Sequence, residues 1–310
     1  MIRPAPAITR RSVLMGAAAL PAVASLPSAA FARAEMLGAA TTRFNRFKLG
    51  GFEVTALLAG TRTVPDPHTI FGLDASADDF AAASAAAGIP TDRAQFFFTP
   101  TVINTGAELI LFDTGLNPGG ISGALQAAGY STDQVDKVVL THMHGDHIGG
   151  MAEEGKATFA NAAYLTGATE FDAWDMAGND GFEAKVRPFA EQMTMLDDGG
   201  AVTSGITAVA AHGHTPGHMA YMIESDGQQL LLGADFANHY IWSLAYPDWD
   251  VKFDRDKEMA AETRRKLLGM LAADKMPFIG YHMPWPALGY VEARGDGFQY
   301  VPASYQMMLE

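Results

Sequence analysis

Hydrophobic residues in this chain fall into short runs that end at glycine, proline or polar residues. Runs of this kind are typical of β-strands, including strands that are buried on both faces. The predicted strands are Phe52–Leu58, Phe96–Ile103, Glu108–Phe112, Lys137–Leu140, Ala163–Leu165, Ile206–Ala210, Met219–Ile223, Gln229–Leu232 and Pro277–Tyr281.

Other segments show the spacing of apolar positions that is typical of helices. The predicted helices are Ala77–Ala87, Ile121–Ala128, Ala168–Met176, Val186–Met193 and Lys257–Ala273. Strands come first and then mix with helices, which indicates packed sheets with helices outside them. No proline- or serine-rich linker divides residues 35–310, so we expect a single domain there.

Residues 1–34 have a different pattern from the rest of the chain. A basic start with Arg10 and Arg11 precedes the uncharged stretch Ser12–Ala32, and the small residues Ala32 and Ala34 follow. These are the parts of a cleaved secretory signal, and the paired arginines resemble a twin-arginine signal. We expect a periplasmic or secreted protein. Two prolines inside the uncharged stretch argue against the alternative, a retained membrane anchor, so no stable membrane insertion is expected after cleavage.

Composition narrows the classes of function. The chain has 310 residues, of which 48% are hydrophobic and 18% charged, and this suits a folded protein with a large core. It has no cysteine, which excludes disulfides, thiolate-bound zinc and cysteine nucleophiles. The net charge of −14 disfavours nucleic acid as a partner. We expect a small-molecule substrate and a chain that acts alone or as a homodimer.

The nine histidines are unevenly placed. His142, His144, Asp146 and His147 lie within six residues, directly after a predicted buried strand. Two residues that are two positions apart in an extended segment point to the same side. Imidazole and carboxylate groups are ligands for zinc and similar cations, so this segment predicts a metal site.

Three further segments carry candidate ligands. Residues 212–218 contain His212, His214 and His218 in a tight loop, of which only one need be a ligand. Asp235 and His282 each follow a predicted strand. Asp235 and His282 would each be weak evidence for a metal site alone. Together with residues 142–147 and 212–218, they form a series of candidate ligands.

This series resembles the metallo-β-lactamase superfamily. Its H-x-H-x-D-H motif is similar to residues 142–147, and its later positions match His214, Asp235 and His282. The resemblance extends from about residue 50 to about residue 300. It implies an α/β fold, an αββα sandwich of two mixed β-sheets with helices on the outer faces and a dinuclear metal site at one edge of the sheets.

The resemblance also implies the role of each residue. The ligands of one cation would be His142, His144 and His214. Those of the other would be Asp146, His147 and His282. Asp235 would bridge two divalent ions, which we expect to be Zn²⁺, and Asp146 and Asp235 are the expected catalytic residues. Asp113 is similar to the family's strand-end aspartate that supports a ligand, and we expect a supporting role for His218 as well.

Two such cations lower the pKa of a shared water, so that hydroxide can attack a carbonyl carbon or a phosphorus. Residues 213–218, 282–286 and 297–302 resemble the methyl parathion hydrolase-like and lactonase-like subgroup. That resemblance implies a neutral lactone or an organophosphate triester as substrate. Aromatic residues that could line its pocket, with ordinary core packing as the alternative for each, are Phe96, Phe97, Phe98, Trp174 and Trp285.

Other functions of the same metal core stay open. A β-lactamase or a thioester hydrolase would use the same ligands. A non-hydrolytic di-iron protein that handles oxygen or nitric oxide, and a binding protein with structural metals, are alternatives from other classes.

Overall fold

The computed structural model describes residues 35–308, and a compact unit begins at Thr42. The predicted signal at residues 1–34 lies outside the described residues and stays a prediction. Among the helices of the described part, none is both long and apolar enough to cross a membrane.

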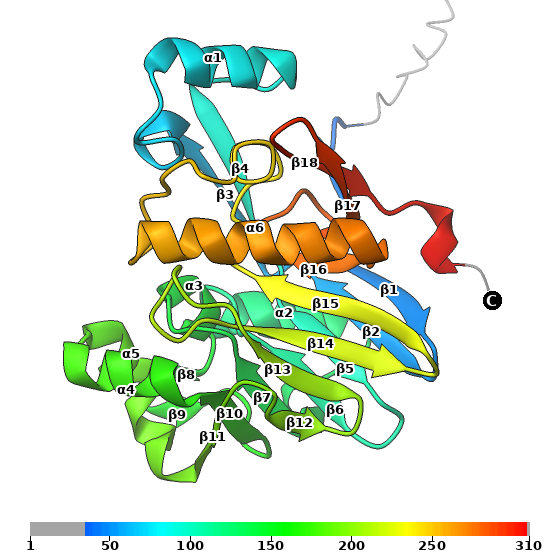
Figure 1. The fold of residues 1–310 in the computed structure, drawn as a ribbon. Helices are drawn as coiled ribbons and strands as arrows, with labels where there is room; N and C mark the ends of the chain where they lie inside the picture. Colours follow the sequence, from blue (N-terminus) through cyan, green and yellow to red (C-terminus); the bar gives the residue numbers. More distant parts are fainter. Residues whose placement is uncertain (1–34, 309–310) are drawn as a thin grey trace, which may run out of the picture. The chain divides into compact units, whose positions relative to one another are not determined.

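Two seven-stranded mixed sheets form the centre of this unit (Figure 1). The first sheet, in spatial order, consists of β1 (Phe44–Leu49), β2 (Phe52–Leu57), β5 (Thr101–Asn104), β6 (Leu109–Phe112), β7 (Lys137–Leu140), β10 (Ala163–Gly167) and β11 (Met193–Leu196). The second consists of β12 (Ala201–Thr203), β13 (Ile206–Ala210), β14 (Met219–Ser225), β15 (Gln228–Ala234), β16 (Phe278–Gly280), β17 (Leu288–Arg294) and β18 (Gly297–Pro302). β6, β7, β10 and β11 pair in parallel, as do β15 and β16.

Six α-helices are present in the described residues. They are α1 (Ala77–Ala86), α2 (Pro118–Ala127), α3 (Gly145–Ile148), α4 (Ala168–Ala177), α5 (Asp180–Lys185) and α6 (Lys257–Asp274). Four 3₁₀ turns and two small sheets complete the unit. They are η1 (Pro67–Thr69), η2 (Thr132–Gln134), η3 (Arg187–Gln192), η4 (Tyr305–Met308), the ribbon of β3 (Gly60–Pro65) with β4 (Arg93–Phe98), and the pair β8 (Ala152–Glu153) with β9 (Lys156–Ala157).

The side chains of a central strand point alternately into two different hydrophobic cores, one on each face of the sheet. In β6, Ile110 and Phe112 belong to the core between the two sheets, whereas Leu109 and Leu111 belong to a second core that includes Ile121 of α2. Such a strand is buried on both faces, which explains its continuous apolar run. Figure 1 shows α6 lying across the outer face of the second sheet. The predicted αββα sandwich is therefore confirmed.

Two predicted elements need correction. The run Phe96–Ile103 is not one strand but parts of β4 and β5, which belong to different sheets and are separated by Thr99 and Pro100. Proline lacks the N–H that a strand interior needs. The predicted helix Val186–Met193 is the 3₁₀ turn η3, and the α-helix in this region is the unpredicted α5.

The fold brings several strand ends to one edge. β6, β7, β15 and β16 end directly before Asp113, Thr141, Asp235 and Tyr281, respectively. Ligand sites of α/β sheets lie beyond the carboxyl ends of their strands. Six of the seven predicted metal-binding residues follow these ends, and His214 follows β13.

Candidate metal centre

The structure brings together all seven residues that the sequence singles out as ligands. We call this set the donor cluster: His142, His144, Asp146, His147, His214, Asp235 and His282. Three overlapping groups within it have their ligand atoms within 4.8 Å of one another. Five of the seven side chains are buried, and those of His144 and Asp146 are partly exposed.

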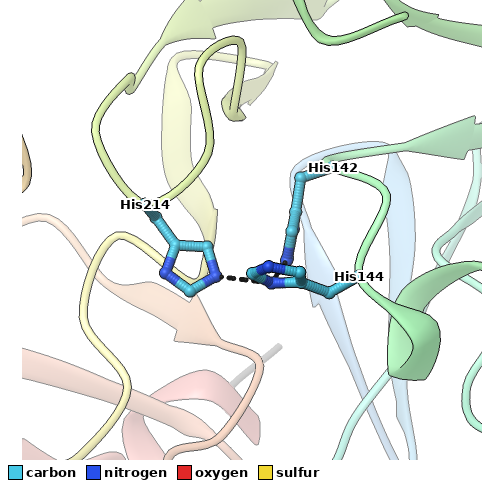
Figure 2. Close-up of side chains that lie close together, drawn as sticks. All are labelled: His142, His144 and His214. Atoms are coloured by element: carbon cyan, nitrogen blue, oxygen red, sulfur yellow. Dashed lines mark hydrogen bonds between the residues drawn. The ribbon is translucent and has the colours of Figure 1, made fainter. Parts of the chain in front are cut away.

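One group within the cluster consists of His142, His144 and His214. The Nδ1 atom of His144 lies 3.0 Å from Nε2 of His142 and 3.0 Å from Nε2 of His214. Figure 2 shows these ring nitrogens turned toward one another, although His214 comes from a loop far from the other two residues in the sequence. Three converging imidazole nitrogens are a donor set for zinc and related cations.

A second group consists of Asp146, His147 and His282. Oδ2 of Asp146 lies 3.3 Å from Nε2 of His282 and 3.7 Å from Nε2 of His147. Asp146 and His147 are in α3, which follows β7 of the first sheet, and His282 follows β16 of the second sheet. This group therefore also joins the two sheets.

Asp235 lies between the two groups. Its Oδ2 atom is 3.5 Å from Nε2 of His214 and 3.1 Å from Nε2 of His282, and its Oδ1 atom is 3.4 Å from Nε2 of His147. Ala234, directly before it, has a φ of 51°. Residues other than glycine rarely adopt such a φ, and residues with this backbone strain are common at functional sites.

Two buried polar atoms of the donor cluster indicate whether divalent cations fit there. Nε2 of His147 and Oδ1 of Asp235 are inaccessible to solvent and have no hydrogen-bond partner. Buried polar groups are almost always paired, because an unpaired one costs about 1–3 kcal/mol. Both atoms lie among the converging donors, so divalent cations would satisfy them.

Hydrogen bonds at the opposite ring nitrogens orient the ligands. Nδ1 of His147 donates to Oδ2 of Asp113 over 2.8 Å, and Nδ1 of His282 donates to the carbonyl of Phe97 over 2.8 Å. Nδ1 of His214 donates to Oδ1 of Asp254 over 2.9 Å. These bonds leave Nε2 of each ring facing the cluster, as metal-binding imidazoles require.

Asp254 is a supporting residue that the sequence analysis missed. Its other oxygen accepts a hydrogen bond of 2.8 Å from Arg264 of α6, and both side chains are buried. Asp254 stands 40 positions after His214 in an irregular segment. No local spacing could have linked the two residues.

The supporting roles expected for Asp113 and His218 agree with their contacts. Asp113 also accepts hydrogen bonds from the backbone N–H and the hydroxyl of Thr141, directly before His142. Nε2 of His218 accepts from the backbone N–H of Asp235 over 3.0 Å. His218 therefore fixes the backbone of a cluster residue while its ring stays outside the three groups of ligand atoms.

Glu170 joins the two histidine loops, and sequence reasoning did not find it. Its buried carboxylate accepts hydrogen bonds from the backbone of Met143 and Gly217 and from the side chains of Thr215 and Trp174. A Cβ atom at Gly217 would lie 2.0 Å from the backbone nitrogen of Glu170, so only glycine permits this approach. The loop containing residues 213–218 is thereby held against α4.

Electrostatics divide the histidines into two kinds. Burial and the neighbouring histidines lower the pKa of His142 well below its usual value and that of His144 to about 3. Burial also opposes a charge on His282, but Asp235 and Asp146 outweigh it and raise its pKa to about 10. For His147, Asp235 and Asp113 likewise outweigh burial and raise the pKa. Cations at the cluster would compete with protons for these two rings.

Comparison with known proteins assigns the family. Residues 99–279, more than half of the chain, match the sequence model of the metallo-beta-lactamase superfamily. The chain belongs to this superfamily. The prediction from the sequence motifs is confirmed, and with it the general class of metal-dependent hydrolases.

Relatives of this metallo-β-lactamase-fold chain include enzymes of known structure. AidC, a dizinc quorum-quenching lactonase solved with a product, N-hexanoyl-L-homoserine, is 25% identical, with a TM-score of 0.78 over 85% of this chain and 98% of AidC. The hydrolase AbOPH is 23% identical, with a TM-score of 0.78 over 86% of this chain and 100% of AbOPH. The uncharacterised protein YobT of Bacillus subtilis is 26% identical over 55% of this chain and 75% of its own length.

A cavity of about 510 Å³, which we call the front cavity, opens onto the donor cluster. His144, Asp146, His214, Asp235 and His282 lie at its floor. Its walls are Arg62, Val64, Ile70, Phe96, Phe98, Leu116 and Phe253. The walls are therefore apolar except for one arginine.

The expectation for the pocket residues needs correction, because Phe97, Trp174 and Trp285 are not among the lining residues of the front cavity. Phe97 projects from the opposite face of β4 to Phe96 and Phe98, since side chains alternate along a strand. Trp174 is buried behind the cluster, with its ring edge-on to His144 and its N–H donating to Glu170. Trp285 is half-buried in the loop after His282.

Proposed function

We propose that this protein is a dinuclear metallohydrolase that opens neutral lactones. The observation that carries the proposal is the donor cluster at the floor of an apolar cavity of about 510 Å³. The reacting ester would lie at the floor, and the apolar part of the substrate would contact the walls. The similarity to a dizinc lactonase over most of both chains supports this substrate class.

Zn²⁺ is the proposed cation, because imidazole nitrogens dominate the donor set. Two divalent cations bound there would lower the pKa of a bound water and would polarise the ester oxygen. The chain itself positions the donors: Asp113, Asp254 and the carbonyl of Phe97 hold three imidazoles with Nε2 toward the cluster. The phenylalanine walls exclude water from the apolar part of the substrate.

The aromatic walls favour a second candidate substrate. Phe96, Phe98 and Phe253 offer ring surfaces to an aryl leaving group. An aryl organophosphate triester is neutral and presents such a group. Both substrates require the same chemistry at the floor.

The experiment is a substrate panel on the zinc-loaded protein. It compares δ-decalactone, an aryl dialkyl phosphate triester, a chromogenic β-lactam and an acyl thioester at equal concentrations. We expect the highest kcat/KM for the lactone, and loss of activity with a chelator. Turnover of the β-lactam or the thioester without turnover of the lactone or triester would contradict the proposal.

Export by a twin-arginine signal is part of the same proposal. The support for it is the pattern of residues 1–34 described above. Replacing Arg10 and Arg11 with lysine should leave the full-length precursor in the cytoplasm. Finding Met1 at the N-terminus of the exported wild-type protein would show that the segment is not cleaved.

A further inference from the structure

The β3–β4 ribbon has cavities on both of its faces. The strands are antiparallel and pair Val64 with Ala94 and Thr63 with Gln95. Val64 lines the front cavity, whereas Thr63, Gln95 and Phe97 line a second cavity of about 410 Å³, which we call the back cavity. Alternation along β4 thus places Phe96 and Phe98 at the front cavity and Gln95 and Phe97 at the back cavity.

Rings and apolar side chains form most of the back cavity. Ile89, Phe97, Tyr240, Trp242 and Pro284 contribute to its walls. Its lining also includes His282 of the donor cluster, and Arg93, which makes an exposed ion pair of 3.2 Å with Asp92. Aromatic walls of this kind fit a flat apolar group.

His239 is a buried polar side chain of the back cavity, only 8% exposed, and it is joined there by the buried ring of His282. Its Nδ1 atom accepts hydrogen bonds of 3.2 Å from the backbone N–H groups of Ile241 and Trp242. A nitrogen that accepts two such bonds carries no proton, so the proton of the neutral ring is on Nε2. Burial lowers the pKa of His239 to about 3, which keeps the ring neutral.

The Nε2–H group of His239 is a donor without a partner among the described residues. The ring is stacked on Trp242, with 3.9 Å between centroids and 18° between planes, so its position is fixed. This donor is not among the buried polar atoms that lack a partner, so it is accessible to solvent, and a bound acceptor oxygen can take its hydrogen bond in place of solvent.

We propose that the back cavity is a second binding site, for a neutral aromatic molecule with one acceptor oxygen. The oxygen accepts the hydrogen bond from Nε2–H of His239, and the ring lies against Phe97 and Tyr240. A carboxylate would lose its hydration against the apolar walls beside the neutral His239, and Arg93 already faces Asp92. A pure hydrocarbon leaves the donor unpaired. The proposal does not depend on the substrate of the donor cluster.

Acetophenone is a suitable probe, since it has one ring and one carbonyl oxygen and no ester bond to hydrolyse. Titration calorimetry of the zinc-loaded protein should show its binding. Benzoate, of similar shape but negatively charged, should bind at least about tenfold more weakly, and toluene, which lacks the acceptor, about fivefold more weakly or worse. Equal affinity for the three compounds, or no binding of acetophenone, would overturn the proposal.

Variants then locate the site. In His239→Asn the amide oxygen can accept the two backbone bonds while the shorter side chain no longer places an N–H group at the Nε2 position, and Ile89→Trp fills the cavity from its half-buried edge. Both should weaken acetophenone binding about fivefold or more. The matched control Val64→Trp fills the front cavity instead and should leave the affinity unchanged. Binding that is lost in Val64→Trp but kept in the other two variants would place acetophenone in the front cavity and contradict the proposal.

Discussion

The floor and the walls of the front cavity are built by different kinds of structure. The floor is the donor cluster, whose members follow strands of the two large sheets and are held by Asp113, Asp254 and His218. The walls come from the two-stranded β3–β4 ribbon and from connecting segments, and Phe253 is 38% exposed. A large sheet positions side chains rigidly, whereas an isolated two-stranded ribbon is marginally stable. The comparison indicates that changes at the floor alter the chemistry, and changes at the walls alter the choice of substrate.

The largest effect is expected at Asp235, which faces both groups of ligand atoms. Asp235→Ala should lower kcat about a thousandfold or more, at least as much as the loss of one group that stabilises a transition state. Elemental analysis should show fewer than two metals per chain. Asp235→Asn keeps the side-chain volume without the charge and should also lose activity while circular dichroism shows a folded protein. Full activity in either variant would refute a role for Asp235 at the floor.

A smaller effect is expected at Asp254, which holds His214 from behind. Asp254→Asn should weaken binding of one cation about 10- to 100-fold, as loss of an outer partner of a ligand does. The measurement is competition with a chromogenic chelator. The matched control is Asp248→Asn, which changes an exposed partner of the neighbouring Arg265 and should leave metal affinity unchanged. Equal effects of the two variants would mean that Asp254 does not act through His214.

Metal affinity should depend on pH with a definite sign. Without cations, the carboxylates hold the pKa of His282 at about 10, so its ring is protonated at pH 7 and must lose that proton to bind a metal. As the pH rises toward that pKa, the apparent dissociation constant of the metal therefore falls, by about tenfold per pH unit for each proton released. Calorimetry in buffers of different ionisation enthalpy counts the protons. Zero proton release at pH 7 would contradict the expected charge of His282.

The smallest effect is expected at the walls. Phe253→Ala removes one partly exposed ring and should raise KM for an apolar substrate about fivefold, equivalent to about 1 kcal/mol of lost contact. Metal content and thermal stability should not change. Trp285→Ala is the comparison, because that ring is not in the front cavity, and it should leave KM unchanged. A larger rise in KM for Trp285→Ala than for Phe253→Ala would mean that the substrate binds outside the front cavity.

The floor could be predicted from the sequence, whereas the walls could be predicted only in part: Phe96 and Phe98 line the front cavity, and Phe97, Trp174 and Trp285 do not. His142, His144, Asp146 and His147 are close in sequence because one turn after β7 presents all four, and Asp235 and His282 are recognisable at the ends of apolar runs. Phe97 was misjudged because sequence alone does not show which side of the ribbon faces the cluster. Asp254 was missed because only tertiary packing brings it to His214.

The same distinction holds for the fold. Runs such as Leu109–Phe112 are apolar because both faces are buried, so they stand out in the sequence. Most residues of β3 are exposed, and β18 has only two buried positions, so both strands lack that signal. The boundary between β4 and β5 depends on a switch between sheets at Pro100, which an apolar run conceals.

The most direct test of the donor cluster is the number of metal ions bound by the purified wild-type protein after saturation with zinc and removal of excess. Elemental analysis alongside quantitative amino-acid analysis gives this ratio. Two ions per chain are predicted, because three ligand atoms converge on each side of Asp235. One ion per chain, unchanged in His282→Ala, would contradict the dinuclear site.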